Sequence, residues 1–179
     1  RYDVKHKEYI YKIWNNPIKN PFYADRAYHV PQLYSDETVE KMNSAAQYFC
    51  GKHDFCSYMA QGSKIVDTNR EIKYASVVRE GDFIIFNFAA VRSVGTDVKS
   101  TVRTVYYYNV ERKGNIIELK VCANGFLYNM VRIMTGTLLL VAQGKIEPED
   151  IQKITESKNR KNAGATAPAC GLYLNKVEY

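Results

Sequence analysis

The sequence predicts an α+β fold in which an antiparallel sheet is covered on one face by about three helices. In residues 7–14 and 171–179, every second side chain belongs to the same set, so a strand would carry one set on each face, as strands with one buried face do. Residues 62–90 and 95–123 each have the pattern of strand, turn and strand. Three other stretches carry apolar residues at helical spacing. Together these patterns predict the sheet and its helical cover.

The first predicted strand covers Lys7-Glu-Tyr-Ile-Tyr-Lys-Ile-Trp14 and places Tyr9, Tyr11 and Ile13 on one face. The stretch that follows, residues 15–32, contains three prolines, so we expect an ordered but irregular loop there. At the other end of the chain, residues 171–179 are predicted to form the last strand.

Three helices are predicted by their ends and their apolar stripes. Ser35 is a good N-cap for the first helix, and Gly51 follows its end. The second helix is predicted to begin at Phe126, directly after the Asn124-Gly125 turn signal. The third covers residues 149–158, after Pro148.

The two hairpin segments are copies of one another. Residues 62–90 and 95–123 align without a gap at an offset of 33 residues, a spacing that indicates an internal repeat. Each copy has its turn at an equivalent place, Glu80-Gly-Asp82 in the first and Lys113-Gly-Asn115 in the second.

Charge and cysteine content restrict the function classes. Lysine and arginine number 25 against 19 acidic residues, giving +6 and a pI near 9.0, which favours a polyanionic partner and is equally compatible with a solvated basic surface. The four cysteines lack the paired spacing of a zinc site, and no secretory or membrane-length apolar run occurs. We therefore expect a cytoplasmic protein with reduced thiols, no metal site and no membrane association.

One charge, Arg132, lies inside the apolar second helix. An arginine keeps its proton, so near a core it must contact a carboxylate, a phosphate or water. The alternative is a side chain that extends from the edge of the helix into solvent. The residues alone leave both possibilities open.

Two motifs identify a family. The stretch Asn124-Gly-Phe-Leu-Tyr-Asn-Met-Val-Arg132 resembles the signature of the tRNA pseudouridine synthases that modify the anticodon arm, the TruA type. The later run Ala163-Gly-Ala-Thr-Ala-Pro-Ala-Cys-Gly-Leu-Tyr-Leu174 resembles the closing motif of the same family. The resemblance covers nearly the whole chain, but only the C-terminal half of such an enzyme.

The resemblance implies isomerisation of uridine to pseudouridine in the anticodon stem-loop (positions 38–40) of tRNA, with no metal or organic cofactor. It implies that Tyr9 stacks on the target base, that Leu172 lines the base pocket, and that Arg132 pairs with the catalytic aspartate. That aspartate belongs to an N-terminal Arg-Thr-Asp-x-Gly-Val-His motif, which this sequence lacks. We therefore expect a C-terminal domain, spanning residues 1–179, that binds RNA but is inactive alone.

Two arginines are candidates for phosphate contact, the first by the same resemblance and the second if its loop lies on a nucleic acid. Arg160 matches an arginine of the closing motif, with a helix-dipole partner as the alternative, and Arg26 lies in the proline-rich loop, with an exposed loop charge as the alternative. The expected partner is tRNA, and many members of the family are homodimers. A non-catalytic RNA-binding module and a dimerisation domain remain rival hypotheses.

The family pattern needs one hairpin before its Asn-Gly-Phe-Leu helix. The second copy, residues 95–123, runs directly into that helix, so we assign it to the family position. We treat the first, residues 62–94, as an extra hairpin that extends the sheet or packs at its edge.

Overall fold

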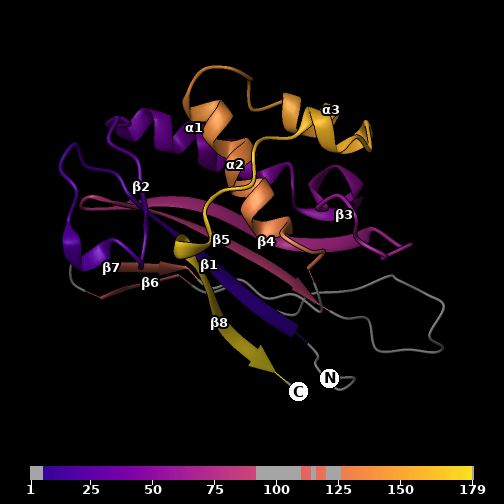
Figure 1. Ribbon diagram of the computed structural model, residues 1–179, viewed down its shortest axis with the longest axis horizontal. Coiled ribbons are helices and arrows are strands. Elements are labelled where there is room, and N and C mark those ends of the chain that lie inside the picture. Colours follow the sequence, from indigo (N-terminus) through magenta and orange to yellow (C-terminus); the bar gives the residue numbers. More distant parts are fainter. Residues whose placement is uncertain (1–5, 92–109, 114–115, 120–125, 179) are drawn as a thin grey trace.

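The computed structural model describes residues 6–91, 110–113, 116–119 and 126–178, and within them it contains a six-stranded sheet (Figure 1). The strand order is β2-β1-β5-β4-β3, and β8 also pairs with β1. The pairings are antiparallel except for a short parallel contact between β1 and β2. These strands are β1 (His6–Trp14), β2 (Tyr28–His29), β3 (Gly51–Asp54), β4 (Asn69–Glu80), β5 (Phe83–Val91) and β8 (Leu172–Glu178).

Strand β1 is central to the arrangement. It pairs with β5 along its whole length, from His6 opposite Val91 to Trp14 opposite Phe83. Its other edge is shared, because β8 pairs with the first part of β1 and β2 with the last two residues. The predicted first and last strands are therefore confirmed, and they are neighbours in the sheet.

The three predicted helices are confirmed and lie on one face of the sheet (Figure 1). They are α1 (Asp36–Gln47), α2 (Met130–Ala142) and α3 (Asp150–Glu156). Ser35 caps α1, since its hydroxyl oxygen accepts a hydrogen bond from the backbone N–H of Thr38 at 3.2 Å. The described part of the chain also contains four single turns of 3₁₀ helix: η1 (Pro21–Tyr23), η2 (Cys56–Tyr58), η3 (Arg160–Asn162) and η4 (Ala169–Gly171).

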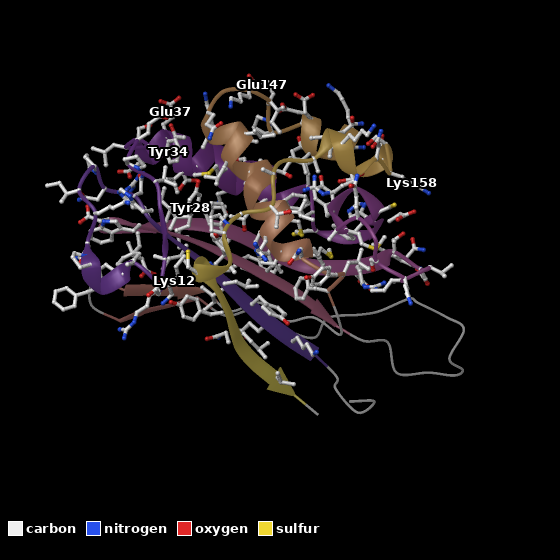
Figure 2. All side chains as sticks on the ribbon, in the orientation of Figure 1. Lys12, Tyr28, Tyr34, Glu37, Glu147 and Lys158 are labelled. Carbon is white, nitrogen blue, oxygen red and sulfur yellow. The ribbon has the colours of Figure 1, made fainter. Side chains whose placement is uncertain are left out.

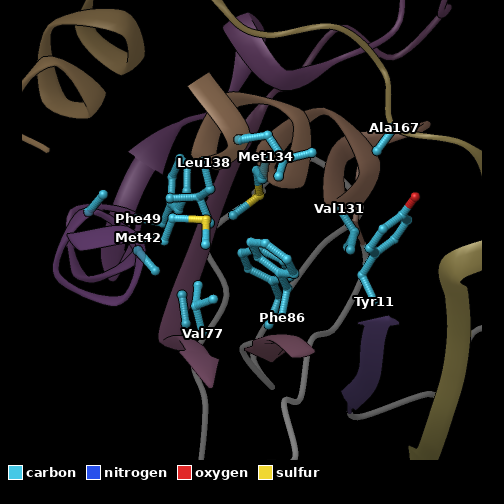
Figure 3. Close-up of a cluster of buried hydrophobic side chains, with 14 of the residues drawn as sticks. Tyr11, Met42, Phe49, Val77, Phe86, Val131, Met134, Leu138 and Ala167 are labelled. Carbon is cyan, nitrogen blue, oxygen red and sulfur yellow. The ribbon is translucent and has the colours of Figure 1, made fainter. Parts of the chain in front are cut away.

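The core lies between this helical layer and the sheet (Figure 3). Tyr11 and Phe86 extend from neighbouring strands and are fully buried, as are Met134 and Leu138 of α2. Alternation along β1 therefore places Tyr9, Tyr11 and Ile13 on the helix side, as predicted.

Helix α2 begins at Met130, four residues later than predicted from the apolar spacing. The reason is Asn129, which has a left-handed backbone with φ of 60°. Asparagine tolerates that conformation, which is incompatible with a continuous right-handed helix. Residues 126–129 therefore form a turn that leads into the helix.

The expectation that the first hairpin copy is peripheral is wrong. Strands β4 and β5 come from that copy and lie in the middle of the sheet, between β1 and β3. The physical reason is that β5 is apolar on both faces: Ile84 and Phe86 are buried on one side and Ile85 on the other. Of the second copy, β6 (Val110–Lys113) and β7 (Ile116–Leu119) form a separate two-stranded sheet, and β7 packs against β4. The rest of that copy lies outside the described residues.

Candidate functional site

The guanidinium of Arg132 is fixed by two hydrogen bonds at the start of α2. Its Nε donates to the backbone oxygen of Ala167 at 2.6 Å, and its Nη1 donates to Oδ1 of Asn129 at 3.0 Å. The side chain is half-buried, and no carboxylate among the described residues forms an ion pair with it. Arg132 thus has a fixed orientation and a further donor group, Nη2, for which the described part of the chain provides no ionic partner.

The loop of residues 163–168 lies directly against α2 and holds this arginine. The backbone N–H of Ala167 donates to the backbone oxygen of Arg132 at 3.1 Å, while Nε of Arg132 donates in return to Ala167. Further along, the N–H of Gly164 donates to Oγ1 of Thr137 at 3.0 Å. The loop is therefore attached to the helix chiefly through its backbone.

Two glycines make this close approach possible. A Cβ atom on Gly136 would lie 1.8 Å from the backbone oxygen of Ala165, and one on Gly164 would lie 2.5 Å from backbone atoms of Gly136. Such distances are far below van der Waals contact, so neither position has room for a side chain. Packing therefore requires glycine both at position 136 of α2 and at position 164 of the closing motif.

Tyr9 lies on β1, on the same side of the sheet as α2. Its ring meets that of Phe126 edge to face, with centroids 5.0 Å apart. The side chain is half-buried, and this burial raises the pKa of the phenol, which therefore stays neutral at physiological pH. On the neighbouring strand β8, Leu174 lies opposite Tyr9, and its side chain is exposed.

Tyr11 links β1 to the loop that holds Arg132. Its hydroxyl donates to the backbone oxygen of Pro168 at 2.6 Å, and Figure 3 shows its ring beside Val131 and Ala167. Burial raises the pKa of Tyr11, while the positive charge of Arg132 acts in the opposite direction. Tyr11 is not among the residues predicted for the site, although its spacing of two residues from Tyr9 predicts the same face of the strand.

Leu172, expected to line the base pocket, is half-buried and pairs with Tyr11 rather than with Tyr9. Gly171 allows the chain to enter β8 here, because a Cβ on it would lie 2.6 Å from the backbone oxygen of Lys12. The structure thus brings Arg132, Tyr9 and Leu172 to the same side of the sheet, around the start of α2.

Arg160 lies on the other side of the same loop. Its Nη1 donates to the backbone oxygen of Ala163 and its Nη2 to Oγ1 of Thr166, both at 3.3 Å. It lines a cavity of about 370 Å³ together with the small residues 163–165 and with Ala60, Gln61, Lys161 and Thr166. This cavity is open and basic, and it shares its loop with the Arg132 site.

Arg26 is placed elsewhere. It is exposed in the segment between η1 and β2, and its backbone oxygen accepts a hydrogen bond from the hydroxyl of Tyr173. Tyr173 points to the side of β8 opposite Leu172, because it is the adjacent residue on a strand. The structure therefore does not bring Arg26 together with Arg132.

Among the described carboxylates, Asp54 is occupied by structural hydrogen bonds and an ion pair. Asp54 accepts hydrogen bonds from the Thr68 hydroxyl and from the Cys56 N–H, and its Oδ2 lies 3.1 Å from Nζ of Lys158. Lys158 is labelled in Figure 2. Burial acts to raise the pKa of Asp54, but these hydrogen bonds and the Lys158 charge leave it below its usual value. Asp54 ends β3, at the edge of the sheet away from β1.

Neither a metal-binding cluster nor a membrane-spanning helix occurs within residues 6–91, 110–113, 116–119 and 126–178. These residues contain no group of three or more histidine, cysteine or acidic side chains placed to hold a metal ion. No helix formed by them has the length and apolar character needed to cross a membrane.

Comparison with known proteins shows the family to which the sequence is similar. The family profile described as tRNA pseudouridine synthase matches residues 86–179. Among curated proteins, the chain is 37% identical over 179 residues to tRNA pseudouridine synthase A of Acetivibrio thermocellus and 40% identical to that of Anoxybacillus flavithermus. The match covers the whole of this chain but only 59% and 58% of those two relatives. The chain thus spans little more than half the length of the relatives it matches.

Proposed function

Because this chain belongs to the tRNA pseudouridine synthase family, we propose that it forms the C-terminal part of an enzyme that isomerises uridine to pseudouridine in the anticodon stem-loop of tRNA. The observation that carries the proposal is Arg132, whose guanidinium is held by Ala167 and Asn129 without a carboxylate partner among the described residues. It is oriented to receive an aspartate from the remainder of the enzyme.

The reaction needs a carboxylate and a dry, shaped site. The bond between C1′ of the ribose and N1 of uracil breaks, the base turns, and C1′ bonds to C5. The proton at C5 is released and N1 gains one, so the product is an isomer and no oxidant or reductant is consumed. We expect no cofactor. Arg132 keeps the incoming aspartate ionised and oriented, since an adjacent cation favours the carboxylate form.

Tyr9 and Leu172 provide the base-facing part of the site. The target base must leave its stack, and an aromatic ring offers a replacement surface for its face. Tyr9 is half-buried with its ring braced by Phe126, so its orientation is fixed before substrate binds. Leu172 forms the apolar wall of the base pocket, and the exposed Leu174 opposite Tyr9 extends this wall.

Arg160 and Arg26 supply phosphate contacts in this proposal. The cavity beside Arg160 has the volume and positive charge to receive a backbone phosphate of the nucleotide next to the target. Arg26 lies away from Arg132 and contacts a more distant part of the tRNA. A homodimer and a cytoplasmic location complete the proposal, and both rest on the family alone.

A tritium-release assay tests the proposal directly. Anticodon-arm tRNA labelled at uracil C5 is incubated with this chain, with a separately expressed N-terminal segment of a family member that carries the Arg-Thr-Asp motif, and with both. We expect release only in the mixture. Release by this chain alone would contradict its dependence on a missing aspartate, and tRNA binding without release in the mixture would favour an RNA-binding module.

The variant Arg132→Lys tests whether Arg132 acts by pairing with a carboxylate in a fixed geometry or only by its positive charge. Lysine keeps the charge but lacks the rigid planar fork, so it cannot reproduce the fixed geometry in which Arg132 contacts Ala167 and Asn129 and still presents Nη2 to a carboxylate. We expect the release rate in the mixture to fall about tenfold to hundredfold, with tRNA binding retained. Lys145→Ala, at an exposed position in the connection after α2, serves as the control. An unchanged rate for Arg132→Lys would remove the proposed role.

A further inference from the structure

Tyr128 lies on the protein surface, just before the start of α2. Its side chain is 67% exposed, whereas that of Leu127 before it is 2% exposed. No described residue forms a hydrogen bond with the Tyr128 hydroxyl group or a contact with its ring. A single exposed aromatic residue is common on protein surfaces and by itself indicates no function. The surroundings of this ring therefore decide what it does.

The backbone around Tyr128 is fixed. Its backbone oxygen accepts a hydrogen bond from the N–H of Ala60 at 3.1 Å. The preceding residue, Leu127, is buried in the core. The following residue, Asn129, has its left-handed backbone and accepts a hydrogen bond from Arg132. The ring of Tyr128 thus extends from a backbone that is already held, so contact with a ligand would order little beyond the ring itself.

Tyr128 is close along the chain to the proposed base pocket. Phe126, two residues earlier, contacts the Tyr9 ring edge to face, with centroids 5.0 Å apart. Two residues span at most about 7 Å of chain. The backbone of Tyr128 therefore lies near the ring that is proposed to receive the target base.

A direct hydrogen bond also joins Tyr128 to the wall of the Arg160 cavity. Ala60, which donates to the Tyr128 oxygen, lines that cavity together with Gln61. The described residues of the lining include two cations, Arg160 and Lys161, and no acidic side chain. Tyr128 is therefore adjacent both to the base pocket and to a cavity whose charge suits a phosphate.

An exposed ring and a phosphate site meet the needs of RNA from which one base has been flipped. When the target base leaves its stack, the base next to it loses a stacking partner. An aromatic side chain offers a replacement surface, and it accepts any base because every base has a flat π face. A phosphate bound beside that ring restrains the sugar-phosphate chain that carries the base. The start of α2 and the cavity provide both contacts.

We propose that Tyr128 is a second stacking residue, which receives the base of a nucleotide next to the target while the phosphate of that nucleotide occupies the Arg160 cavity. The ligand is RNA with an unstacked base, without a requirement for one base type. This inference rests on the proposed function, from which it takes the position of the target base at Tyr9.

Filter binding of anticodon-arm tRNA to this chain tests the stacking contact. Tyr128→Ala removes the ring, and we expect Kd to rise at least about fivefold, as when other stacking aromatic residues are replaced by alanine. Tyr128→Phe keeps the flat ring and loses only the hydroxyl group, so its Kd should stay within about twofold of that of the unchanged chain. Because the side chain is exposed, neither variant should shift the urea midpoint of unfolding.

The matched control is Leu33→Ala, which removes another exposed apolar side chain, 59% exposed. Figure 2 shows Tyr34, the next residue, at the opposite end of the molecule from Lys158. Lys158 precedes Arg160 by two residues, so the control lies far from the cavity and its Kd should be unchanged. An unchanged Kd for Tyr128→Ala, or equal losses for Tyr128→Ala and Leu33→Ala, would overturn the proposal.

Photochemical cross-linking identifies the nucleotide on Tyr128. An anticodon-arm hairpin carries 5-iodouridine either directly before or directly after a target uridine, and irradiation of the complex joins this base to an aromatic ring on which it stacks. Peptide mass spectrometry locates the cross-link. We expect it on Tyr128 from one of the two hairpins. Cross-links to other residues only, or none from either hairpin, would overturn the assignment.

Tritium release in the mixture with the N-terminal segment separates failure of this inference from failure of the proposed function. No release with the unchanged chain would overturn the proposed function and the inference that rests on it. Release with the unchanged chain, together with normal tRNA binding by Tyr128→Ala, would overturn the inference alone. If Tyr128→Ala in addition lost release, the ring would contact the remainder of the enzyme and not the RNA.

Discussion

Arg132 is held by one near neighbour and one distant one. Asn129 precedes it by three residues, whereas the Ala167 oxygen is 35 residues further along the chain. The sequence predicts that a lone charge in an apolar helix needs a partner, and it places Asn129 within reach. The Ala167 contact involves a backbone atom, which every residue possesses, so no residue type predicts it.

The replacement Gly164→Ala tests the packing of loop against helix at a single residue. Its added Cβ would lie 2.5 Å from Gly136 backbone atoms, so the loop must move away from α2. We expect the free energy of unfolding to fall by about 1–3 kcal/mol, as for overpacking of a close contact. Urea denaturation measures the change.

The control is Ala165→Ser, at an exposed position of the same loop. It should change the free energy of unfolding by less than about 0.5 kcal/mol. Equal stabilities of Gly164→Ala and the unchanged protein would show that the loop adapts to a side chain.

Asp54 makes stability depend on pH in a definite direction. Its folded pKa lies below the usual value of 3.8, so its contribution is fully present above that pH and is lost as the pH falls below it. We expect Asp54→Asn to lower the free energy of unfolding by about 1–2 kcal/mol at pH 7, where a charged hydrogen-bond acceptor is lost. The difference should shrink below about pH 3.8.

Urea midpoints at neutral and acidic pH measure this difference. Lys158→Ala should reproduce part of the neutral-pH loss, because it removes the ion-pair partner of Asp54. A difference between Asp54→Asn and the unchanged protein that is constant with pH would contradict the assignment.

At the scale of helices and strands, the sequence predicts the elements that are marked by a local pattern of residues. The cap at Ser35 gives the start of α1, and alternation gives β1 and β8. The start of α2 is predicted four residues early, since apolar spacing does not reveal the left-handed Asn129. Strand order is not predicted, because two copies of one hairpin carry similar local patterns and the order depends on which of them meets β1 and β3.

The N-cap of α1 offers a test of an element. Ser35→Ala removes the acceptor for the Thr38 N–H and should lower the free energy of unfolding by about 1 kcal/mol. Thermal unfolding measures the shift. Ser44→Ala, at an exposed position within the same helix, is the matched control and should be neutral or slightly stabilising, since alanine is the better helix former. A loss of the same size for both variants would show that the cap contributes nothing specific.

At the scale of the whole molecule, the excess of six positive charges predicts salt-dependent association with a polyanion. If Arg160 contacts one phosphate, Arg160→Gln should weaken tRNA binding at low salt. It should also reduce the slope of log K against log salt concentration by about 0.7–0.9. Filter binding over a range of salt concentrations measures both quantities.

Lys145→Gln removes the same charge at an exposed position away from the cavity and is the control for net charge. Equal slopes for the two variants would mean that Arg160 acts only through the overall field. The sequence predicts the sign of this charge, whereas its location at a cavity beside the Arg132 loop depends on the tertiary arrangement of residues 160–166.

The attachment of residues 163–168 to α2 through backbone atoms has an evolutionary consequence. The positions of the two glycines are fixed by contact, and Arg132 is held by the backbone oxygen of Ala167, whereas Ala165 and Thr166 line the cavity. Substitutions at those outward positions can therefore alter what the cavity recognises while the orientation of the arginine is inherited unchanged. Recognition and chemistry can diversify separately on the two sides of one loop.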